Sequence, residues 1–356
     1  MKVLVTKFRH IGDVLLTTPL LRNLKLNFPD WQIDLAINRE TAPVVALNPD
    51  INRLILYDRA RIKSLPFWQR VKEEWRFFSQ FKGYDIVINL TEGERGAIIA
   101  HLSKAPIRIG YPPKKGIFKK VYTHPLPPQR DRHTVDANLD PIPILGGEIK
   151  EKRVYIYWPE EAEEKVARLN LPPRFVHCHP VSRWLFKTPP PEQMGKIVTF
   201  IQRELNLPVV VTAAPSQREL EYINRLKGAS KLPFIDLSGQ LTLPEVAALN
   251  KKALFFVGVD TAVMHISAAN DTPVYALFGP SGAFHWGPWD NNLMVSRYKN
   301  RNGIQQMGIH RVYQRDWECV PCGKDGCDGT KISRCLVELE LARIFSDLKE
   351  FANGSD

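Results

Sequence analysis

Short apolar runs bounded by turn residues alternate along the chain with longer segments whose apolar positions follow a helical period. The runs lie at 2–6, 32–38, 52–57, 84–90, 175–179, 208–213, 253–258 and 273–279. The segments of helical period include 64–80, 93–103, 189–206, 215–227 and 242–250. Continuous β-branched runs of this length are typical of parallel strands that are covered on both faces. The alternation therefore predicts βαβ units and a doubly wound α/β fold.

This alternation is interrupted once, near the middle of the chain. Residues 111–153 are rich in proline, lysine and glycine and show no clear strand pattern. The alternation restarts at the apolar run VYIYWP, residues 154–159. The sequence therefore predicts two Rossmann-like domains that are joined somewhere within 140–172.

We place the N-terminal domain at 1–160, the C-terminal domain at 161–335 and one last helix in the segment 336–356. No strand follows that helix. In doubly wound domains the carboxyl ends of the strands and the amino ends of the helices meet at one edge of the sheet. A ligand is therefore expected in a cleft between the two domains.

The composition is that of a globular protein, because 44% of the 356 residues are hydrophobic and 24% are charged. No window approaches 18 consecutive apolar residues, which predicts no transmembrane helix. The N-terminal apolar run is short and is interrupted by Lys7, Arg9 and His10, which is typical of a first strand rather than of a signal peptide. The sequence therefore favours a cytoplasmic protein.

The net charge of +11 is concentrated in one segment. Residues 59–132 contain 16 lysine and arginine residues against 6 aspartate and glutamate residues. A phosphorylated substrate, an anionic membrane surface and nucleic acid all suit such a segment, and so does a basic face that contacts only solvent. No zinc-finger, RRM or basic-heptad motif occurs in the sequence, so nucleic acid is the weakest of these partners.

Four of the five cysteines fall within one glycine- and aspartate-rich stretch of 17 residues: Cys319, Cys322, Cys327 and Cys335. Four thiolates could form a structural zinc site, although the spacing is not that of two regular CxxC knuckles. The alternative is a reduced, turn-rich loop with free thiols. We assign no metal to the function.

The first candidate for chemistry is the pair Gly12 and Asp13, which follows the first predicted strand and opens the next helix. A glycine in the first βα turn lets a ligand approach the backbone, and a carboxylate there can face the cleft. A simple helix N-cap also explains an aspartate at this place. The turn contains neither the G-x-G-x-x-G dinucleotide fingerprint nor the GK[ST] of a P-loop.

A second candidate is the loop of HPVSRWLFKTPP, which places Ser182, Arg183 and Lys187 between a strand and a helix. A hydroxyl, a guanidinium and an ammonium group together suit a diphosphate, whose negative charges need donors and neutralisation. A basic surface loop is the alternative.

The third candidate is FFVGVDTAVMHISAAN, where Asp260 and Thr261 stand between a buried strand and a helix. The first turn of that helix presents backbone N–H groups that can bind phosphate, and His265 lies one turn after Thr261. Alternatively, Asp260 is an N-cap and His265 a hydrogen-bonded core histidine. Ser281 and Gly282 follow the next strand in the same way.

In this order the segments FRHIGDVLLTTP, HPVSRWLFK, VDTAVMH and FGPSGAFHWGPW resemble the lipopolysaccharide core heptosyltransferases, glycosyltransferase family 9. The resemblance extends from Lys2 to about Leu341 and, with the tail CVPCGKDGCDG, is strongest to the heptosyltransferase III branch. It implies the GT-B architecture, with a lipid acceptor on the first domain and ADP-heptose on the second. It also implies a last helix that crosses back to the first domain.

The resemblance assigns roles to individual residues. It makes Asp13 the general base and Lys187 the diphosphate lysine, with Ser182, Arg183, Asp260, Thr261, Ala262 and His265 around the diphosphate. Leu241 would pack on the adenine, and Gln217 or Glu219 would bind the ribose. Arg9, His10, Gly12, Arg59, Arg61 and Lys63 are expected on the acceptor side. Lys114, Lys115, Lys119 and Lys120 are expected at a membrane-facing acceptor rim.

The implied reaction is an inverting transfer of L-glycero-D-manno-heptose to a heptose of phosphorylated heptosyl-Kdo-lipid A at the inner leaflet of the cytoplasmic membrane. No metal cofactor is expected, because Lys187 and a helix N-terminus neutralise the leaving diphosphate. Family members often have glycine where this chain has Ala262, which leaves less room beside the phosphates. The alternatives are a transferase of the same architecture with another sugar or acceptor, and a nucleotide-binding module without catalysis.

Overall fold

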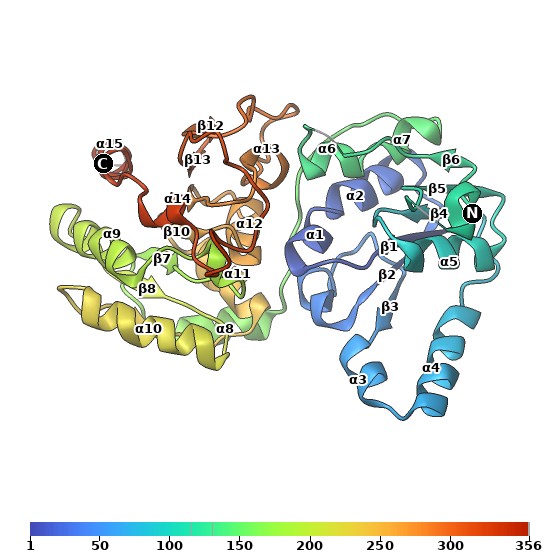
Figure 1. Cartoon of the computed structure of the whole chain (residues 1–356), viewed down its shortest axis with the longest axis horizontal. Coiled ribbons are helices and arrows are strands. Elements are labelled where there is room, and N and C mark those ends of the chain that lie inside the picture. Colours follow the sequence, from blue (N-terminus) through green and yellow to red (C-terminus); the bar gives the residue numbers. More distant parts are fainter. Residues whose placement is uncertain (115, 130, 355–356) are drawn as a thin grey trace. The chain divides into compact units, whose positions relative to one another are not determined.

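The computed structural model describes residues 1–114, 116–129 and 131–354. The chain divides into two compact units, Met1–Tyr157 and Trp158–Asp356, so the division falls close to residue 160. Each unit is a parallel or mostly parallel sheet with helices on both faces (Figure 1). This architecture confirms the doubly wound α/β prediction.

The N-terminal unit contains a six-stranded sheet in the order β3-β2-β1-β4-β5-β6. The strands are β1 (Lys2–Lys7), β2 (Gln32–Asn38), β3 (Arg53–Tyr57), β4 (Ile86–Asn89), β5 (Ile107–Gly110) and β6 (His124–Pro125). All neighbours pair in parallel. β1 therefore lies in the middle of the sheet, and the turn that follows it opens at the sheet's centre.

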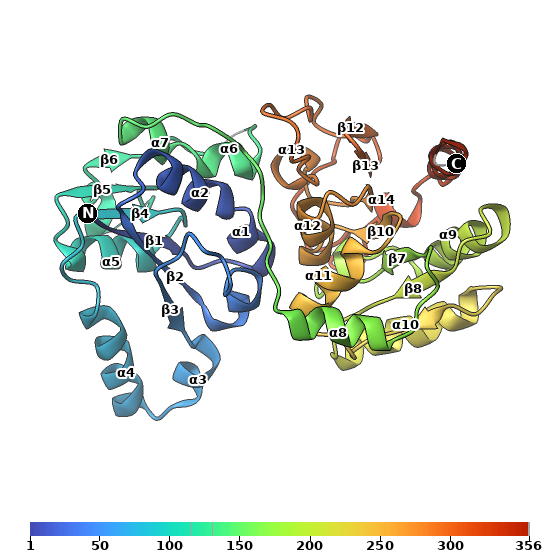
Figure 2. The ribbon, with the colours of Figure 1, turned by 180° about the vertical axis from the view of Figure 1, so that it is seen from behind.

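Two groups of helices cover the faces of this sheet (Figures 1 and 2). One group packs around α2 and contains α1 (Ile11–Leu15), α2 (Thr18–Asn27), α6 (Thr134–Asn138) and α7 (Pro141–Ile144). The other contains α3 (Arg59–Ser64), α4 (Phe67–Ser79) and α5 (Glu94–Ser103). Leu4, Phe77 and Ala97 belong to one buried cluster, so the second group shares its core with β1.

The C-terminal unit contains a seven-stranded sheet in the order β12-β13-β11-β10-β7-β8-β9. Its strands are β7 (Val176–His179), β8 (Val209–Val211), β9 (Ile235–Asp236), β10 (Phe256–Val259), β11 (Val274–Leu277), β12 (Gln305–Met307) and β13 (His310–Tyr313). Only the β12–β13 pair among these pairings is antiparallel. β10 therefore lies between β11 and β7, close to the middle of the sheet.

Helices on both faces bury this second sheet. α8 (Glu160–Arg168), α11 (Leu243–Lys251) and α12 (Ala262–Ala269) pack against one another in sequence, and α8 and α11 share a buried cluster with Val210. α9 (Pro191–Glu204), α10 (Gln217–Ala229) and α15 (Ala342–Asn353) cover the other face, where Cys178 and Val257 are buried. The short helices α13 (Ala283–Trp286) and α14 (Arg334–Val337) follow β11 and precede α15.

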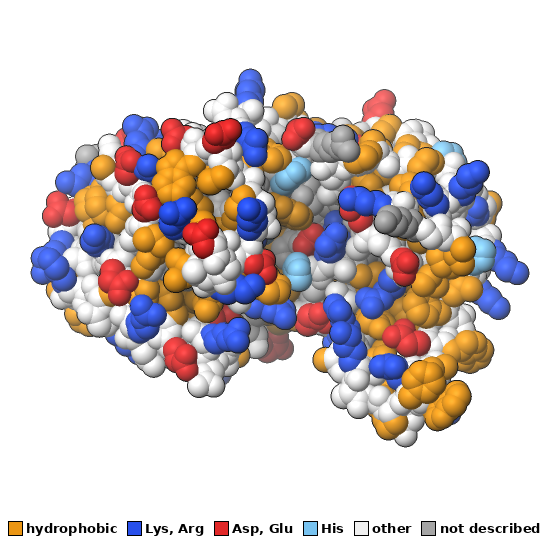
Figure 3. Space-filling model, viewed as in Figure 1, with side chains coloured by type: hydrophobic (Ala, Val, Ile, Leu, Met, Phe, Trp, Pro, Cys, Tyr) orange, Lys and Arg blue, Asp and Glu red, His pale blue; other side chains and the backbone are white. Residues whose placement is uncertain are grey.

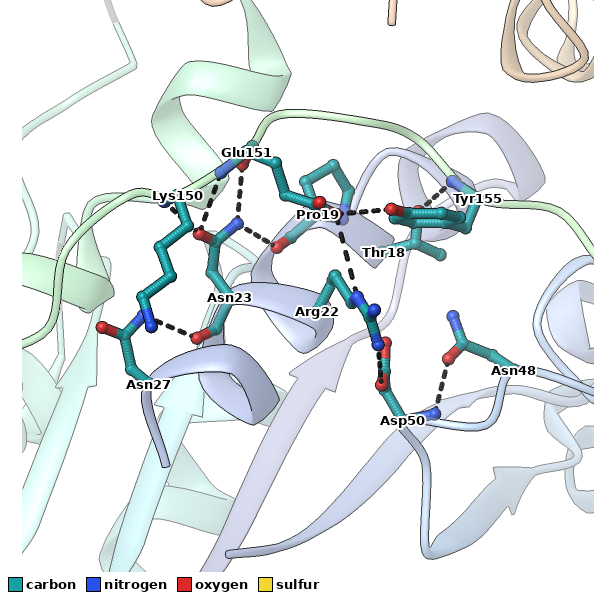
Figure 4. A network of polar contacts seen from close by, with 10 residues as sticks. All are labelled: Thr18, Pro19, Arg22, Asn23, Asn27, Asn48, Asp50, Lys150, Glu151 and Tyr155. Carbon is teal, nitrogen blue, oxygen red and sulfur yellow. Dashed lines mark hydrogen bonds and ion pairs between the residues drawn. The ribbon is translucent and has the colours of Figure 1, made fainter. Parts of the chain in front are cut away.

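The run VYIYWP does not restart the sheet, so that detail of the prediction is wrong. The backbone there follows helix α2, where the side chain of Asn23 donates to the carbonyl of Glu151 and accepts from the backbone N–H of Lys150 (Figure 4). The Tyr155 N–H donates to the hydroxyl of Thr18 at 2.9 Å. Because these contacts take backbone groups that a strand would pair, the segment remains an extended connection between the units.

The last helix also differs from the expectation. The prediction that it returns to the N-terminal unit is wrong, because α15 packs on α9 of the C-terminal unit. Phe345 stacks on Phe200 with ring centroids 4.2 Å apart, and Ile344 and Leu348 are buried. Phe351 reaches Phe255 beneath the sheet. The apolar face of α15 must be covered to be kept from water, and the sheet face beside α9 covers it.

A network of buried polar side chains crosses the C-terminal unit from β7 to α12. The hydroxyl of Thr212 lies 2.8 Å from His177 Nε2 and 2.9 Å from His179 Nδ1. Asn250 lies 2.9 Å from His177 Nδ1 and donates to Ser267 on α12. Burial, with the charge of His179, lowers the pKa of His177 to about 3, and burial lowers the pKa of His179 to about 4.

Acid should therefore destabilise the C-terminal unit. Both histidines have an ordinary pKa of 6.5 when unfolded, so the unfolded chain binds more protons between that pH and about 4. The stabilisation is complete above pH 6.5 and is lost as pH falls. We expect the free energy of unfolding to fall by up to about 1.4 kcal/mol per pH unit for each histidine.

Urea unfolding at several pH values measures this slope. His179→Gln should flatten it, whereas His124→Gln, at an exposed histidine, should leave it as in the wild type. Equal slopes for the wild type and His179→Gln would contradict the assignment.

Candidate active site

Asp13 stands at the centre of the N-terminal unit, in the helix turn directly after β1. Its carboxylate accepts the backbone N–H of His10 at 3.3 Å, so it closes the start of α1 from the third helical position. Asp13 thus takes part in capping the helix, as the alternative interpretation expects, but the N-cap residue itself is His10. Asp13 is half-buried, and Arg9 and His10 beside it are exposed.

Lys7, the last residue of β1, places a buried ammonium group near this carboxylate. Only 2% of Lys7 is exposed, and its Nζ donates to the carbonyl of Leu90 at 3.0 Å and to the side chain of Asn138 at 3.3 Å. Burial lowers the pKa of Lys7 to about 8, with the charge of Asp13 opposing this shift and that of Arg9 adding to it. The lysine and Asp13 therefore interact electrostatically.

The basic residues expected on the acceptor side lie on the short helix α3. Arg59, Arg61 and Lys63 are all exposed. Arg61 forms an ion pair with Glu73 of α4, so this side chain ties α3 to α4. Arg9 lies in a different segment, after β1, where its carbonyl accepts the side-chain amide of Asn38.

In the C-terminal unit the loop after β7 holds Ser182, Arg183 and Lys187. The Ser182 N–H donates to the hydroxyl of Thr188 at 3.0 Å, and its own hydroxyl accepts the Trp184 N–H. Ser182 is buried and fixes the loop, while Arg183 is exposed with its guanidinium over the ring of Trp184. Lys187 ends a short 3₁₀ helix, Leu185–Lys187.

The central contact of this unit is the ion pair between Lys187 and Asp260. Lys187 Nζ lies 2.6 Å from Asp260 Oδ2, and the hydroxyl of Ser281 donates to the same oxygen. Burial alone would raise the pKa of Asp260. The pKa is nevertheless held below its usual value by the charge of Lys187, by the hydrogen bonds from Lys187 and Ser281, and by the nearby His265. The site thus combines an ionised carboxylate with an ammonium group that remains partly exposed.

This cluster joins three loops that follow neighbouring strands, β7, β10 and β11. The strands approach closely because β10 has glycine at position 258, where a Cβ atom would come within 2.5 Å of the carbonyl of His179. The prediction that these segments converge at the carboxyl edge of one sheet therefore agrees with the structure. Ser281, from the FGPS segment, is part of the same cluster.

Helix α12 begins beside the ion pair. Thr261 is its N-cap, and the Thr261 hydroxyl accepts the Met264 N–H at 3.5 Å. Thr261 and Ala262 are half-exposed, which leaves the first turn of the helix open to a ligand. His265 lies on the buried side of the helix with only 4% exposed, so it acts from below the surface on Asp260.

The residues expected around adenosine occupy the turns next to this sheet edge. Leu241 is half-buried directly before Thr242, which with Glu245 forms a capping box at the start of α11. Glu219 is buried and accepts the Ala214 N–H at 2.8 Å, whereas Gln217 is exposed and bonds to Glu221 on the same helix. Burial raises the pKa of Glu219, with the Ala214 and Ser216 bonds and the charge of Arg183 opposing the rise.

The lysines expected at the acceptor rim lie within the segment 114–120. Lys114, Lys119 and Lys120 are exposed, and Ile117 between them is 90% exposed. Phe118 is half-buried against the core and His101, and Lys115 lies outside the described residues.

The thiols of the cysteine-rich stretch are free. In the described part of the chain, no group of three or more His, Cys, Asp or Glu side chains is arranged to hold a metal ion.

Two Rossmann-like units, each built on a doubly wound sheet, are the architecture of a GT-B glycosyltransferase. A solved glycosyltransferase family 9 structure from Veillonella parvula has a TM-score of 0.77 at 22% identity and covers 99% of this chain and 97% of its own. Escherichia coli heptosyltransferase WaaC, solved with ADP-2-deoxy-2-fluoro heptose, has a TM-score of 0.67 at 17% identity, with both chains fully covered.

The model of glycosyltransferase family 9 (heptosyltransferase) matches residues 75–313. Lipopolysaccharide heptosyltransferase 3 of Escherichia coli K12 is 32% identical over 80% of this chain and 85% of its own length. The chain belongs to glycosyltransferase family 9, the heptosyltransferases. The predicted family and enzyme class are confirmed.

Sequence analysis gave no role to Lys7 or to its partner Asn138. A charged residue at the end of an otherwise apolar central strand was the available signal, because burial of a lysine there needs polar partners. Those partners are Leu90, directly after β4, and Asn138 at the end of α6, 83 and 131 residues further along the chain. No local pattern connects them.

Replacement of Lys187 should weaken both binding and catalysis. We expect Lys187→Ala to raise the donor KM and to lower kcat by about 10²-fold, since the ammonium group meets more negative charge in the transition state. Steady-state kinetics measures both constants. Lys196→Ala, at an exposed lysine of α9, should leave them unchanged.

The loss must be separated from the effect of an unpaired Asp260. The double variant Lys187→Met/Asp260→Asn removes both charges. Recovery of wild-type kcat in this double variant, or an unchanged kcat and KM in Lys187→Ala, would contradict diphosphate stabilisation by Lys187.

Proposed function

We propose that the protein transfers L-glycero-D-manno-heptose from ADP-heptose to a heptose of the lipopolysaccharide inner core, as a heptosyltransferase of type III. The main support is the Lys187–Asp260–Ser281 cluster at the first turn of α12, which suits a sugar diphosphate. The similarity to lipopolysaccharide heptosyltransferase 3 and the WaaC structure with an ADP-heptose analogue support the substrate class.

The donor site is proposed around this cluster. Lys187 and the first turn of α12 at Thr261 and Ala262 hold the diphosphate, and Arg183 contributes charge at its exposed rim. Ser182 and Asp260 position these groups, because both are buried and their hydrogen bonds lie within the protein. His265, on helix α12, supports Asp260 electrostatically.

Leu241 is proposed to pack on the adenine. Of the two ribose candidates we favour Glu219, since its buried carboxylate lies near Arg183 and is fixed by Ala214, whereas Gln217 is directed along its own helix.

Asp13 is proposed as the general base. It removes the proton from the acceptor hydroxyl as that oxygen attacks the anomeric carbon of the donor, and ADP leaves from the opposite side. A single displacement of this kind inverts the anomeric centre. Lys7, held by Leu90 and Asn138, places a positive charge near the Asp13 carboxylate.

Transfer is proposed to need no metal ion. The growing charge on the leaving diphosphate is opposed by the ammonium group of Lys187 and by the N–H groups of α12. Asp260, the acidic side chain nearest to them, already binds Lys187 and Ser281 through one oxygen. We expect EDTA to leave the transfer rate unchanged, and loss of activity that Mg²⁺ restores would contradict this proposal.

The acceptor is proposed to be phosphorylated heptosyl-Kdo-lipid A at the cytoplasmic face of the inner membrane, with the protein bound there peripherally. The exposed side chains of Arg59, Lys63, Lys114, Lys119 and Lys120 suit phosphates of the core and anionic headgroups. Arg9, His10 and Gly12 adjoin Asp13 and are proposed to contact the reacting heptose. Among the described residues, no helix is both long and apolar enough to cross a membrane.

Asp13→Asn should nearly abolish transfer while ADP binding remains. Asparagine keeps an oxygen for the His10 N–H, so the helix start survives, but it cannot accept the proton. We expect kcat to fall by about 10²–10⁴-fold, measured by mass spectrometry of a truncated core acceptor. Calorimetry of ADP binding is the control.

A loss of ADP affinity of about tenfold or more at unchanged fold would argue against Asp13 as a base on the acceptor unit. Such a loss, about 1.4 kcal/mol of binding free energy, would place Asp13 at the donor site instead. Saturable ADP binding by the wild type without any sugar transfer would favour the nucleotide-binding module instead.

Replacement of the lysine cluster Lys114, Lys115, Lys119 and Lys120 by glutamine should weaken binding to anionic liposomes and raise the KM for the lipid-linked acceptor. ADP affinity should not change, and the difference should shrink with salt, because exposed charges are screened within about 10 Å at 0.1 M. Glutamine at the exposed residues Lys196, Lys231, Lys252 and Lys324 is the matched control. Unchanged liposome binding at low salt would reduce the cluster to a solvated basic face.

A further inference from the structure

Helix α4 presents an apolar stripe to solvent on the N-terminal unit. Phe67, Trp68, Val71 and Trp75 are 58%, 80%, 45% and 72% exposed. They fall within an arc of about 100° on the helix, because successive residues are turned by about 100°. Figure 3 shows apolar side chains gathered over the end of the unit where α4 lies in Figure 1. We call these four residues the α4 stripe.

The stripe is held rigidly by the other end of the helix. Phe77 is buried among Phe8, Tyr57 and Phe81, with ring centroids 6.1, 4.8 and 5.1 Å away. The hydroxyl of Tyr57 donates to Glu74 at 2.6 Å. Phe77 therefore anchors the C-terminal end of α4 in the core, while Trp68 in the first turn and Trp75 in the third face solvent.

Basic side chains surround the stripe. Lys72 and Arg76 flank it on one side of the helix, and Arg70 flanks it on the other with its guanidinium over the ring of Phe67. The two acidic residues of α4 are both engaged: Glu73 pairs with Arg61 and Arg76, and Glu74 accepts Tyr57. Over 59–82 the sequence has seven basic residues against these two acidic ones.

We infer that the α4 stripe docks the protein on the surface of an anionic phospholipid bilayer. Tryptophan and phenylalanine rings beside lysine and arginine are the combination that enters the boundary between headgroups and acyl chains. A protein partner would instead have to supply acidic groups opposite Lys72 and Arg70, because charges left unpaired beside an apolar contact are costly. The positive rim thus selects an anionic surface over an apolar protein surface.

This inference rests on the proposed function, in which the acceptor is lipid-linked, and it identifies a surface separate from the lysine cluster at 114–120. A bound stripe would place β3 and α3 beside the membrane, since α4 is joined to them through residues 57–66. The stripe would then bring the acceptor unit to the lipid.

Flotation with vesicles tests the inference without any substrate. The wild type should float with vesicles of phosphatidylethanolamine and phosphatidylglycerol and much less with phosphatidylcholine alone. Trp68→Gln/Trp75→Gln should lower the partition coefficient about tenfold or more, because it removes the two largest inserting rings. Met294→Gln/Val295→Gln alters exposed apolar residues of the C-terminal unit and should bind like the wild type.

Quenching by brominated lipids locates the contact. Tryptophan fluorescence of the wild type should be quenched by anionic vesicles that contain brominated acyl chains. Trp68→Phe/Trp75→Phe keeps apolar rings and should still float, but its remaining six tryptophans should show little quenching. Floating and strong quenching in this variant would place the contact elsewhere and overturn the inference.

Other outcomes are equally decisive. A wild type that does not float, or a glutamine double variant that floats equally well, would overturn the inference. A lipid-free dimer that the glutamine variant converts to a monomer would show that a second copy covers the stripe, which also overturns it. Because a deacylated acceptor needs no membrane, the glutamine variant should keep wild-type kcat/KM on it. Failure of the wild type on that acceptor would contradict the proposed function alone.

Discussion

The half-buried contact between Lys187 and Asp260 holds together the candidate donor site of the C-terminal unit. It joins the loop after β7 to the loop after β10, and Ser281 adds the loop after β11 through the same carboxylate oxygen. Bringing these charges out of water is unfavourable, and their mutual attraction and hydrogen bonds offset that cost only in close geometry. The contact therefore fixes where the ammonium group lies before any ligand arrives. Such preorganisation is what electrostatic stabilisation of a leaving group requires.

The lysines Lys187 and Lys7 differ in how far they are buried. Lys187 remains partly exposed and faces an ionised carboxylate, so it can offer positive charge to a ligand. Lys7 is almost completely buried, bonds to a carbonyl and an amide, and has a pKa lowered by burial to about 8. One lysine can thus meet a ligand directly, whereas the other is enclosed by the protein.

The sequence predicted the strands and helices that repeat the βαβ rhythm, because buried parallel strands leave strong apolar runs. It missed β5, β6, β9, β12 and β13, whose segments include polar or charged residues such as Arg108 and Arg311 instead of an unbroken apolar run. It misread VYIYWP because an apolar run next to a helix face looks like one in a sheet; only the distant contacts of Asn23 and Thr18 distinguish the two. The expected direction of the last helix came from the family resemblance, and the chain departs from it because the apolar face of α15 packs on α9.

The convergence of three of the predicted loops follows from the topology of the sheet. The carboxyl ends of neighbouring parallel strands must meet, so loops that follow β7, β10 and β11 converge whatever their sequences. The partners of each side chain could not be predicted from the sequence. Ser182 fixes its own loop, His265 lies beneath the surface, and Arg61 pairs with Glu73. These roles depend on rotamers and on contacts across the chain. In the α4 stripe the sequence pattern suggests burial where the fold has none. Its tryptophans have the spacing of a helix face that packs on a core, and only their exposure in the structure reveals that the protein's own core does not use them.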